Sequence, residues 1–423
     1  MLPYERKTLE SGLRVVAVPM PASLTTTVLV LTATGSKYET KPLSGVSHFL
    51  EHMCFKGTKK RPSAQAVSEE LDGLGARYNA FTSHEYTGYF AKVENRLLPR
   101  ALDVVADIFL NSTLSAGEME KERGVIIGEI EMGEDDPQRH VVDIFLELLY
   151  GDQPAGWNVA GNRGTIKKMT RGEMADYRAT HYVGSATVVV IAGNFDKKTI
   201  WSDIEKAFEG VSRDGKTDKE KIDDSQSAPA VKTFFKDTSQ THLLLGFRSF
   251  DVYDERQKTL RLLAAVLGGG MSSRLFKRVR DEMGAGYYVS ADNDFFTDHG
   301  FFSIATGVAN PRVKEVLQAI LEETTRMKTE DIPAHELERT KNFLIGGLFS
   351  GLETSNSLAT FYGGNEILGK PMKTPQEIAD DVRAITAEDI RRVAEEIFIG
   401  EKLNLALVGP YKDAAEFLPL LKM

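Results

Sequence analysis

The chain has a single cysteine among its 423 residues, and this scarcity excludes an internal disulfide. It also has no apolar run that approaches the roughly 20 residues needed to span a membrane. The first residues, MLPYERKTLESGLRVV, lack the apolar stretch of a secretory signal peptide. From these absences we expect no membrane association and a reducing compartment, by default the cytoplasm.

A block of basic residues is missing too. Lysine and arginine number 52 against 61 aspartates and glutamates, which gives a net charge of −9. This balance makes nucleic acid a poor partner. The hydrophobic content of 42% and the charged content of 27% are ordinary for a folded globular protein. The length allows two or three domains.

The two halves of the chain resemble each other in three places. The matching segments are 172–196 with 388–412, 71–78 with 280–287, and 115–132 with 333–350. The offset between paired segments varies only from 209 to 218 residues. Three matches in the same order predict two copies of one fold of about 200 residues each.

The polar segment 212–230, SRDGKTDKEKIDDSQSAPA, has no apolar period and is typical of a linker. We therefore expect one domain over 1–211 and a homologous one over 231–423. Each copy begins with β-like runs, and helices, two further strands, more helices and a last strand follow. In the first copy, 77–83 and 86–93 predict a hairpin. This order favours an α+β fold, in which each domain is a mainly antiparallel sheet with helices packed on one face.

Two of the eight histidines stand together in the stretch GVSHFLEHMCFKGT. Residues 43–56 are predicted to form a helix, so His48 and His52 lie on one face, one turn apart. Glu51, three residues after His48, can act on a water molecule at the same point. Two imidazoles beside a carboxylate suit Zn²⁺. The order His-x-x-Glu-His inverts the commoner zinc protease signature, and it predicts a zinc site.

A catalytic zinc site takes a third protein ligand, and the acidic helix predicted over 118–136 offers candidates. Four of its residues share one predicted buried face: Glu122, Val125, Ile126 and Glu129. A buried carboxylate needs a metal ion or a hydrogen-bonding partner, so Glu122 and Glu129 are both candidates. In the second copy, Thr340 and Gly347 occupy the aligned positions, and His-x-x-Glu-His is absent. We expect metal chemistry in the first copy only.

The stretch HFLEHMCFKGT, with Glu129 separated from His52 by 76 intervening residues, resembles the pitrilysin family. This M16 group of inverted-motif zinc peptidases includes the mitochondrial processing peptidase, whose beta subunit is similar, and insulin-degrading enzyme. LGGGMSSRLFKRVRDEMGAGYYVS resembles the signature of the family's second domain, and NAFTSHEYTGYF resembles the strand pair beside its active site. The resemblance covers the whole chain. The length and the two-copy plan are similar to the short bacterial branch, whose members commonly pair as dimers.

The resemblance implies a role for each residue near the predicted metal site. His48, His52 and Glu129 would bind one zinc ion per chain. Glu51 would be the general base that activates water. Glu122 would orient a ligand histidine through a hydrogen bond.

The resemblance also implies substrate contacts from both copies. Arg280 and Tyr287, in RDEMGAGY, would hold the substrate near the metal. Asn79, Ala80 and Phe81 would lie on an edge strand to which a peptide adds as a further strand. That mode of binding uses backbone hydrogen bonds and tolerates many side chains.

The function implied is that of a zinc endopeptidase acting on peptides or unfolded segments. One alternative is a non-catalytic subunit, or one that depends on a partner, and another is a hydrolase of non-peptide substrates. The presence of both halves of the site in one chain favours the first interpretation, and the edge strand favours peptides. The expected partner is an identical chain or a related M16 chain.

Overall fold

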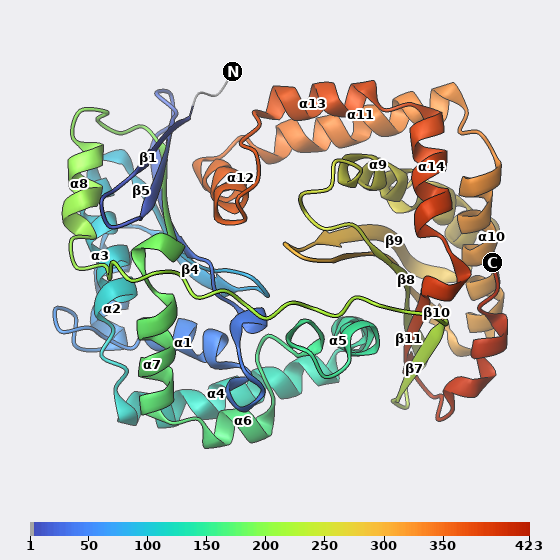
Figure 1. The fold of residues 1–423 in the computed structure, drawn as a ribbon, viewed down its shortest axis with the longest axis horizontal. Helices are drawn as coiled ribbons and strands as arrows, with labels where there is room; N and C mark the ends of the chain where they lie inside the picture. Colours follow the sequence, from blue (N-terminus) through green and yellow to red (C-terminus); the bar gives the residue numbers. More distant parts are fainter. Residues whose placement is uncertain (1–3) are drawn as a thin grey trace. The chain divides into compact units, whose positions relative to one another are not determined.

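The computed structural model describes residues 4–423, which form two compact units. The first unit comprises the chain up to Ile130, Asn158–Glu220 and Phe349–Thr374. The second unit comprises Glu131–Trp157, Lys221–Leu348 and Pro375–Met423. Each unit contains one sheet and takes segments from both halves of the chain (Figure 1).

The first sheet has the strand order β1-β2-β6-β3-β5-β4. Its strands are β1 (Glu5–Thr8), β2 (Arg14–Pro19), β3 (Thr25–Thr32), β4 (Arg77–Thr82), β5 (Thr87–Glu94) and β6 (Thr187–Gly193). Only β2 and β6 run parallel. The predicted hairpin is confirmed, because β4 pairs antiparallel with β5. β4 lies at the edge of the sheet.

The second sheet has the order β7-β11-β8-β10-β9. Its strands are β7 (Ala230–Phe235), β8 (Gln240–Ser249), β9 (Gly286–Phe295), β10 (Gly300–Ala309) and β11 (Leu403–Gly409). Only β7 and β11 run parallel. Apart from β1, this order repeats that of the first sheet, with β9 in the edge position of β4. The α+β class and the tandem copies with mainly antiparallel sheets are confirmed.

Helices of the first copy cover one face of the first sheet. They are α1 (Val46–Cys54), α2 (Ala64–Gly73), α3 (Leu98–Asn111), α4 (Ala116–Asp135), α6 (Arg163–Lys168), α7 (Arg171–His181) and α8 (Ile200–Ala207). Val15, Val28 and Val30 point into the core beneath them. Their neighbours Val16 and Leu29 point to the other face and are equally buried. Both faces of the sheet are therefore apolar and need cover.

The other face of the first sheet is covered by α12 (Ser355–Ile367), a helix of the second copy (Figure 1). Buried Leu358 and Tyr362 pack there against β-strand side chains. A Cβ on Gly363 would lie 2.9 Å from Leu31, so glycine permits the close approach of this helix. The buried carboxylate of Glu366 pairs with Arg14 at 3.3 Å.

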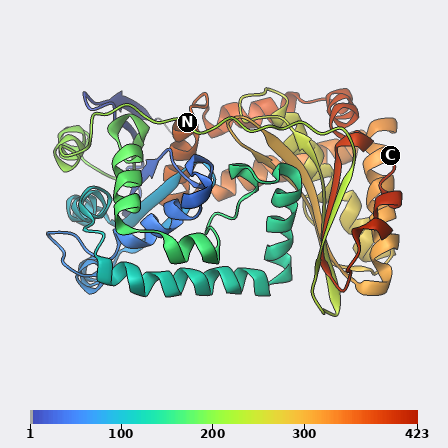
Figure 2. The same cartoon turned by 60° about the horizontal axis from the view of Figure 1, so that its bottom comes forward.

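The second sheet is covered in the same way. On one face lie α9 (Gln257–Gly268), the π-helical segment Phe276–Glu282, α10 (Val313–Thr329), α11 (Ala334–Gly351) and α14 (Ala387–Ile397); α13 (Pro375–Ala384) packs beside α11. On the other face lies α5 (Pro137–Tyr150), a helix of the first copy (Figure 2). A Cβ on Gly246 would lie 2.6 Å from the ring of Phe145, so α5 also packs tightly.

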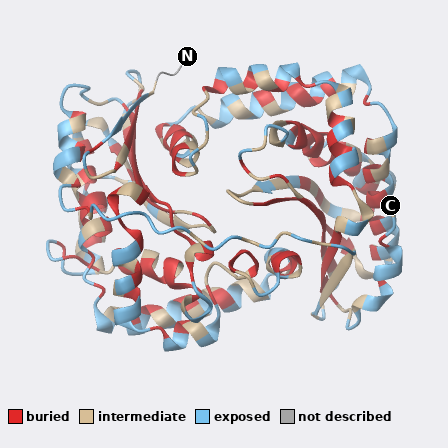
Figure 3. Ribbon diagram, in the orientation of Figure 1, coloured by how far each residue is buried: buried red, intermediate tan, exposed pale blue. Residues whose placement is uncertain are grey.

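The two copies thus exchange one helix each, α5 for α12. The central strands of both sheets are largely buried as a result, whereas the edge strands β1, β4, β7 and β9 are more exposed (Figure 3). The sequence predicted helices on one face of each sheet, and the structure adds one helix on the opposite face. Residues 213–229 contain no helix or strand, within the stretch predicted as a linker. Because the units interleave, the boundaries at 211 and 231 describe the duplication rather than the compact units.

Cutting the chain between the copies should not separate them. We expect a chain cleaved at a protease site inserted after Gly215 to keep both fragments together, because each fragment completes the core of the other's sheet. Co-elution in size-exclusion chromatography and an unchanged circular dichroism spectrum would check this. An isolated 1–215 fragment, which lacks α12, should aggregate or stay unfolded. Separation of the cut fragments, or a monomeric folded 1–215, would contradict the expectation.

Candidate metal centre

The helix α1 begins at a glycine, Gly45, where a side chain would be strained. Gly45 has φ +93°, and a Cβ there would lie 2.6 Å from the carbonyl oxygen of Ala160. Because the N-cap residue Gly45 has no side chain, it cannot cap the helix by a hydrogen bond. Instead the buried carboxylate of Glu39 accepts from the Gly45 and Ser47 backbone N–H groups at 2.7 and 2.8 Å. These contacts fix the turn that precedes His48.

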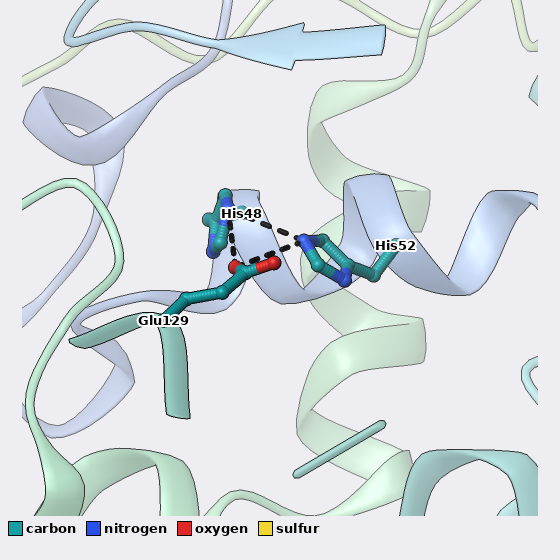
Figure 4. A group of neighbouring side chains, drawn as sticks. All are labelled: His48, His52 and Glu129. Carbon is teal, nitrogen blue, oxygen red and sulfur yellow. Dashed lines mark hydrogen bonds and ion pairs between the residues drawn. The ribbon is translucent and has the colours of Figure 1, made fainter. Parts of the chain in front are cut away.

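Three side-chain atoms from α1 and α4 converge at one point (Figure 4). The Nε2 atoms of His48 and His52 lie 3.3 Å apart. An oxygen of Glu129 lies 3.6 Å from the first and 3.5 Å from the second. Tetrahedral zinc with ligands at about 2.0–2.1 Å requires its ligand atoms to stand about 3.3–3.4 Å apart. Among residues 4–423 this is the one group of three such side chains with metal-like spacing.

Glu122 lies behind His52 and not in this group. Its Oε1 accepts a hydrogen bond from Nδ1 of His52 at 3.0 Å, and its Oε2 lies 2.6 Å from Nζ of Lys56. Although burial opposes ionisation, the bonds from Lys56 and His52 hold the pKa of Glu122 below its usual value. A carboxylate only accepts, so the His52 proton sits on Nδ1 and the Nε2 lone pair is free. Of the two candidate acids, Glu129 is the one beside both Nε2 atoms.

The electrostatics of the group suit metal binding. Burial, together with the neighbouring His52, lowers the pKa of His48 to about 4, so this imidazole is neutral near pH 7. A neutral imidazole is the form that binds metal. Burial also raises the pKa of Glu51, whose charge interacts with His52 and Glu129. A carboxylate with a raised pKa is a better proton acceptor at neutral pH.

The α4 face that carries these acids is buried only in part. Glu122 and Ile126 are buried, as predicted. Val125, however, is 48% exposed, so its place on a buried face was wrongly predicted. The side chain of Glu129 is 38% exposed, which leaves it reachable from solvent. The helix therefore anchors through Ile126 and presents Glu129 at the rim of the core.

The residues predicted to contact substrate in the first copy lie on β4. Ala80 packs toward the core that contains α1, whereas Phe81 packs on the α12 face and Asn79 is exposed. In the described part of the chain, no strand pairs with the outer edge of β4. At the end of β4, the hydroxyl of Thr82 donates to a Glu51 carboxylate oxygen at 2.6 Å. The edge strand is thus attached to the predicted base.

Arg280 and Tyr287 are neighbours within the second unit. Nη1 of Arg280 donates to the carbonyl oxygen of Tyr287 at 2.9 Å, and the guanidinium lies over the ring of Phe276. The Tyr287 side chain is 61% exposed. The structure brings this pair together, and their contribution to the metal centre stays a prediction.

Three residues that hold the site were not predicted from the sequence: Glu39, Lys56 and Thr82. Thr82 could have been found, because it lies near the end of the predicted strand 77–83 and shares a face with Ala80. No spacing rule links Lys56 to Glu122 or Glu39 to the start of α1. These contacts depend on tertiary structure alone.

Comparison with known proteins identifies the family. A model described as Insulinase (Peptidase family M16) matches residues 14–163, and one described as Peptidase M16 inactive domain matches residues 168–344. The zinc protease YmxG of Bacillus subtilis, named as uncharacterized, is 36% identical over 406 residues, or 96% of this chain and 98% of that protein. A similarly named Streptomyces coelicolor protein, SCO5738, is 33% identical over 96% of this chain and 90% of its own length. The chain belongs to peptidase family M16.

Solved structures share the fold. A protease from Helicobacter pylori matches with a TM-score of 0.91 at 23% identity, over 97% of this chain and all of that one. A protein from Pseudomonas fluorescens described as a peptidase M16 inactive domain matches with a TM-score of 0.90 at 18% identity, over 97% and 99% of the two chains. Among the described residues, no helix is both long and apolar enough to cross a bilayer.

The buried carboxyl group of Glu39 should make stability depend on pH. Burial raises the pKa of Glu39 from 4.5 to about 7, so between these values the folded chain holds a proton that the unfolded chain lacks. Its contribution is therefore complete below pH 4.5 and is lost as the pH rises through 7. Glu39→Gln cannot titrate, and should flatten this decline by at most roughly 3 kcal/mol.

Urea unfolding at pH 5 and pH 8 would measure the change for the wild type, for Glu39→Gln and for Glu10→Gln. Glu10 is exposed, so its variant should keep the pH dependence of the wild type. An identical pH dependence in Glu39→Gln would contradict the expectation.

Proposed function

We propose that the chain is a zinc endopeptidase that hydrolyses peptides or unfolded polypeptide segments. The observation that carries the proposal is the triangle of His48, His52 and Glu129 ligand atoms, spaced at 3.3–3.6 Å with Glu51 beside it. Membership of family M16 and the names of the relatives support the same chemistry. One triangle among the described residues corresponds to one zinc ion per chain.

Each site residue of the first copy has a separate role in this proposal. Zinc bound by His48, His52 and Glu129 would supply a Lewis acid that lowers the pKa of water to about 7. Glu51 would be the general base that accepts a proton from water, and Thr82 holds its carboxylate by a hydrogen bond. Glu122 keeps the Nδ1 proton of His52 in place, so that Nε2 remains a ligand atom.

The peptide is held as an added strand. No strand in the described part of the chain pairs with the outer edge of β4, along which Asn79, Ala80 and Phe81 lie. The Ala80 N–H donates to Oδ1 of its neighbour Asn79 at 2.9 Å. Because Thr82 continues the same strand and bonds to Glu51, a peptide paired with β4 runs toward the base. Backbone pairing requires an extended substrate, which favours unfolded segments over folded proteins.

The second copy would contribute Arg280 and Tyr287 to substrate binding. The exposed Tyr287 hydroxyl can donate to a developing oxyanion, a contact typically worth a few kcal/mol. Pairing with an identical or a related chain is proposed from the family resemblance alone, and so is a cytoplasmic location.

The first test of this function is the variant Glu51→Gln. It should keep its zinc and lose at least about a hundredfold in rate, because the general base is gone and no zinc ligand has changed. Cleavage of a quenched fluorescent peptide, with and without a chelator, measures the rate, and elemental analysis measures zinc. Normal cleavage by the variant would contradict the role of Glu51. A wild-type chain that binds zinc but cleaves nothing would favour the partner-dependent alternative.

The second test separates Glu129 from its neighbour Glu131 on α4. Glu129→Gln should weaken zinc binding, since an amide oxygen carries no charge, whereas Glu131→Gln should retain zinc. Glu131 is exposed and lies outside the ligand triangle, so it serves as the control. Zinc content after dialysis decides the matter. Equal retention in both variants would place the third ligand elsewhere.

A further inference from the structure

We infer that Lys56 is a positioning residue for the zinc site, acting on His52 through Glu122. The inference rests on the proposed zinc site and adds a residue to it. Lys56 follows α1 closely, four residues after His52. Its Nζ lies 2.6 Å from Oε2 of Glu122, whose other oxygen accepts from Nδ1 of His52 at 3.0 Å. The three side chains form one continuous chain of contacts.

The need for Lys56 follows from the burial of Glu122. The Glu122 side chain is only 8% exposed, and a carboxylate removed from water requires partners for both oxygens. His52 satisfies one oxygen and Lys56 the other. With both oxygens engaged, the carboxylate plane cannot turn. Oε1 therefore stays on Nδ1 of His52, and Nε2 stays directed at the ligand triangle.

His48 has no comparable support. In the described part of the chain, its buried Nδ1 finds no hydrogen-bond partner. The orientation of the imidazole pair therefore depends on the one nitrogen that is held, Nδ1 of His52. Because Nε2 of His52 lies 3.3 Å from Nε2 of His48, a rotation of His52 would spoil the spacing of the whole triangle.

The backbone of Lys56 is held firmly enough for this role. Its N–H donates to the carbonyl oxygen of Met53 at 3.1 Å, which continues the turn at the end of α1. The loop that follows is fixed by buried Arg61, whose guanidinium binds Asp107 at 2.7 Å. Lys56 thus reaches Glu122 from a backbone that these contacts hold in place.

The test is zinc affinity, measured on the full-length chain by competition with a chromophoric chelator. Lys56→Met should weaken zinc binding about tenfold, as loss of a group that orients a ligand typically does. Lys56→Arg, which keeps the positive charge, should bind zinc with an affinity within about threefold of the wild type. Lys60→Met is the control, because Lys60 lies on the same loop but pairs with Asp103, away from the triangle.

A double-mutant comparison separates positioning from general stability. In a Glu122→Gln background, Lys56→Met should cause no further loss of zinc affinity, since its route to His52 is already broken. Nitrogen chemical shifts of the His52 ring in the zinc-free chain should show a changed tautomer ratio in Lys56→Met and not in Lys60→Met. If Lys56→Met does not fold, Lys56→Gln replaces it in the same comparisons.

The outcomes are distinct. Wild-type affinity in Lys56→Met, or an equal loss in the Glu122→Gln background, would overturn the positioning role and leave the zinc site intact. A wild-type chain that binds no zinc would overturn the proposed site and this inference with it.

Discussion

The structure depends on the need to cover two apolar faces on each sheet with helices from a duplicated chain. The helices of one copy cover a single face, and the second face is covered by α12 in the first unit and α5 in the second. Burying a large apolar side chain such as Leu358 contributes about 1.5–3 kcal/mol, and several do so on each helix. Without the exchanged helix, each sheet would expose a large apolar patch, which favours aggregation.

The first sheet supports a metal centre that is held at three points around α1. At the start of α1, Glu39 accepts hydrogen bonds from two backbone N–H groups that a helix otherwise leaves without partners. Just beyond its end, Lys56 fixes Glu122 and through it His52. From the side, Thr82 at the end of β4 holds Glu51. Preorganisation of this kind matters because a ligand displaced by about 1 Å loses most of its effect.

Whether a feature of the metal centre could be predicted from the sequence depends on how far apart in the chain the interacting residues lie. The spacing of His48, Glu51 and His52 is local, and helical geometry alone predicted their common site. The choice of Glu129 over Glu122 as the third ligand does not depend on local spacing, since both residues fit the same helical face. Only the packing of α4 against α1 distinguishes them. Val125 was placed in the core because spacing reports one side of a helix and not how much of that side is covered.

The helix exchange was hidden for a related reason. The apolar stripe on α5 predicts that this helix packs on a sheet but does not say on which one, and α12 has little apolar periodicity at all. Matching segments of the two copies predicted one repeated fold, and the strand orders of the two sheets agree with it apart from β1. A partner from the other copy leaves no trace in such a comparison, since both copies carry an equivalent helix at equivalent positions.

The exchange also changes the argument for why the second copy persists without metal chemistry. Where the first copy has Glu122, the second has Thr340, whose hydroxyl donates to the carbonyl oxygen of Glu336 within its own helix. Gly347, aligned with Glu129, has no side chain at all. Substrate contacts are not needed to account for this copy, because α12 covers the second face of the sheet whose first face packs against α1. The retention of the second copy is therefore explained by its contribution to the folded core. The role of Arg280 and Tyr287 is a separate question, which measurements of catalytic activity answer.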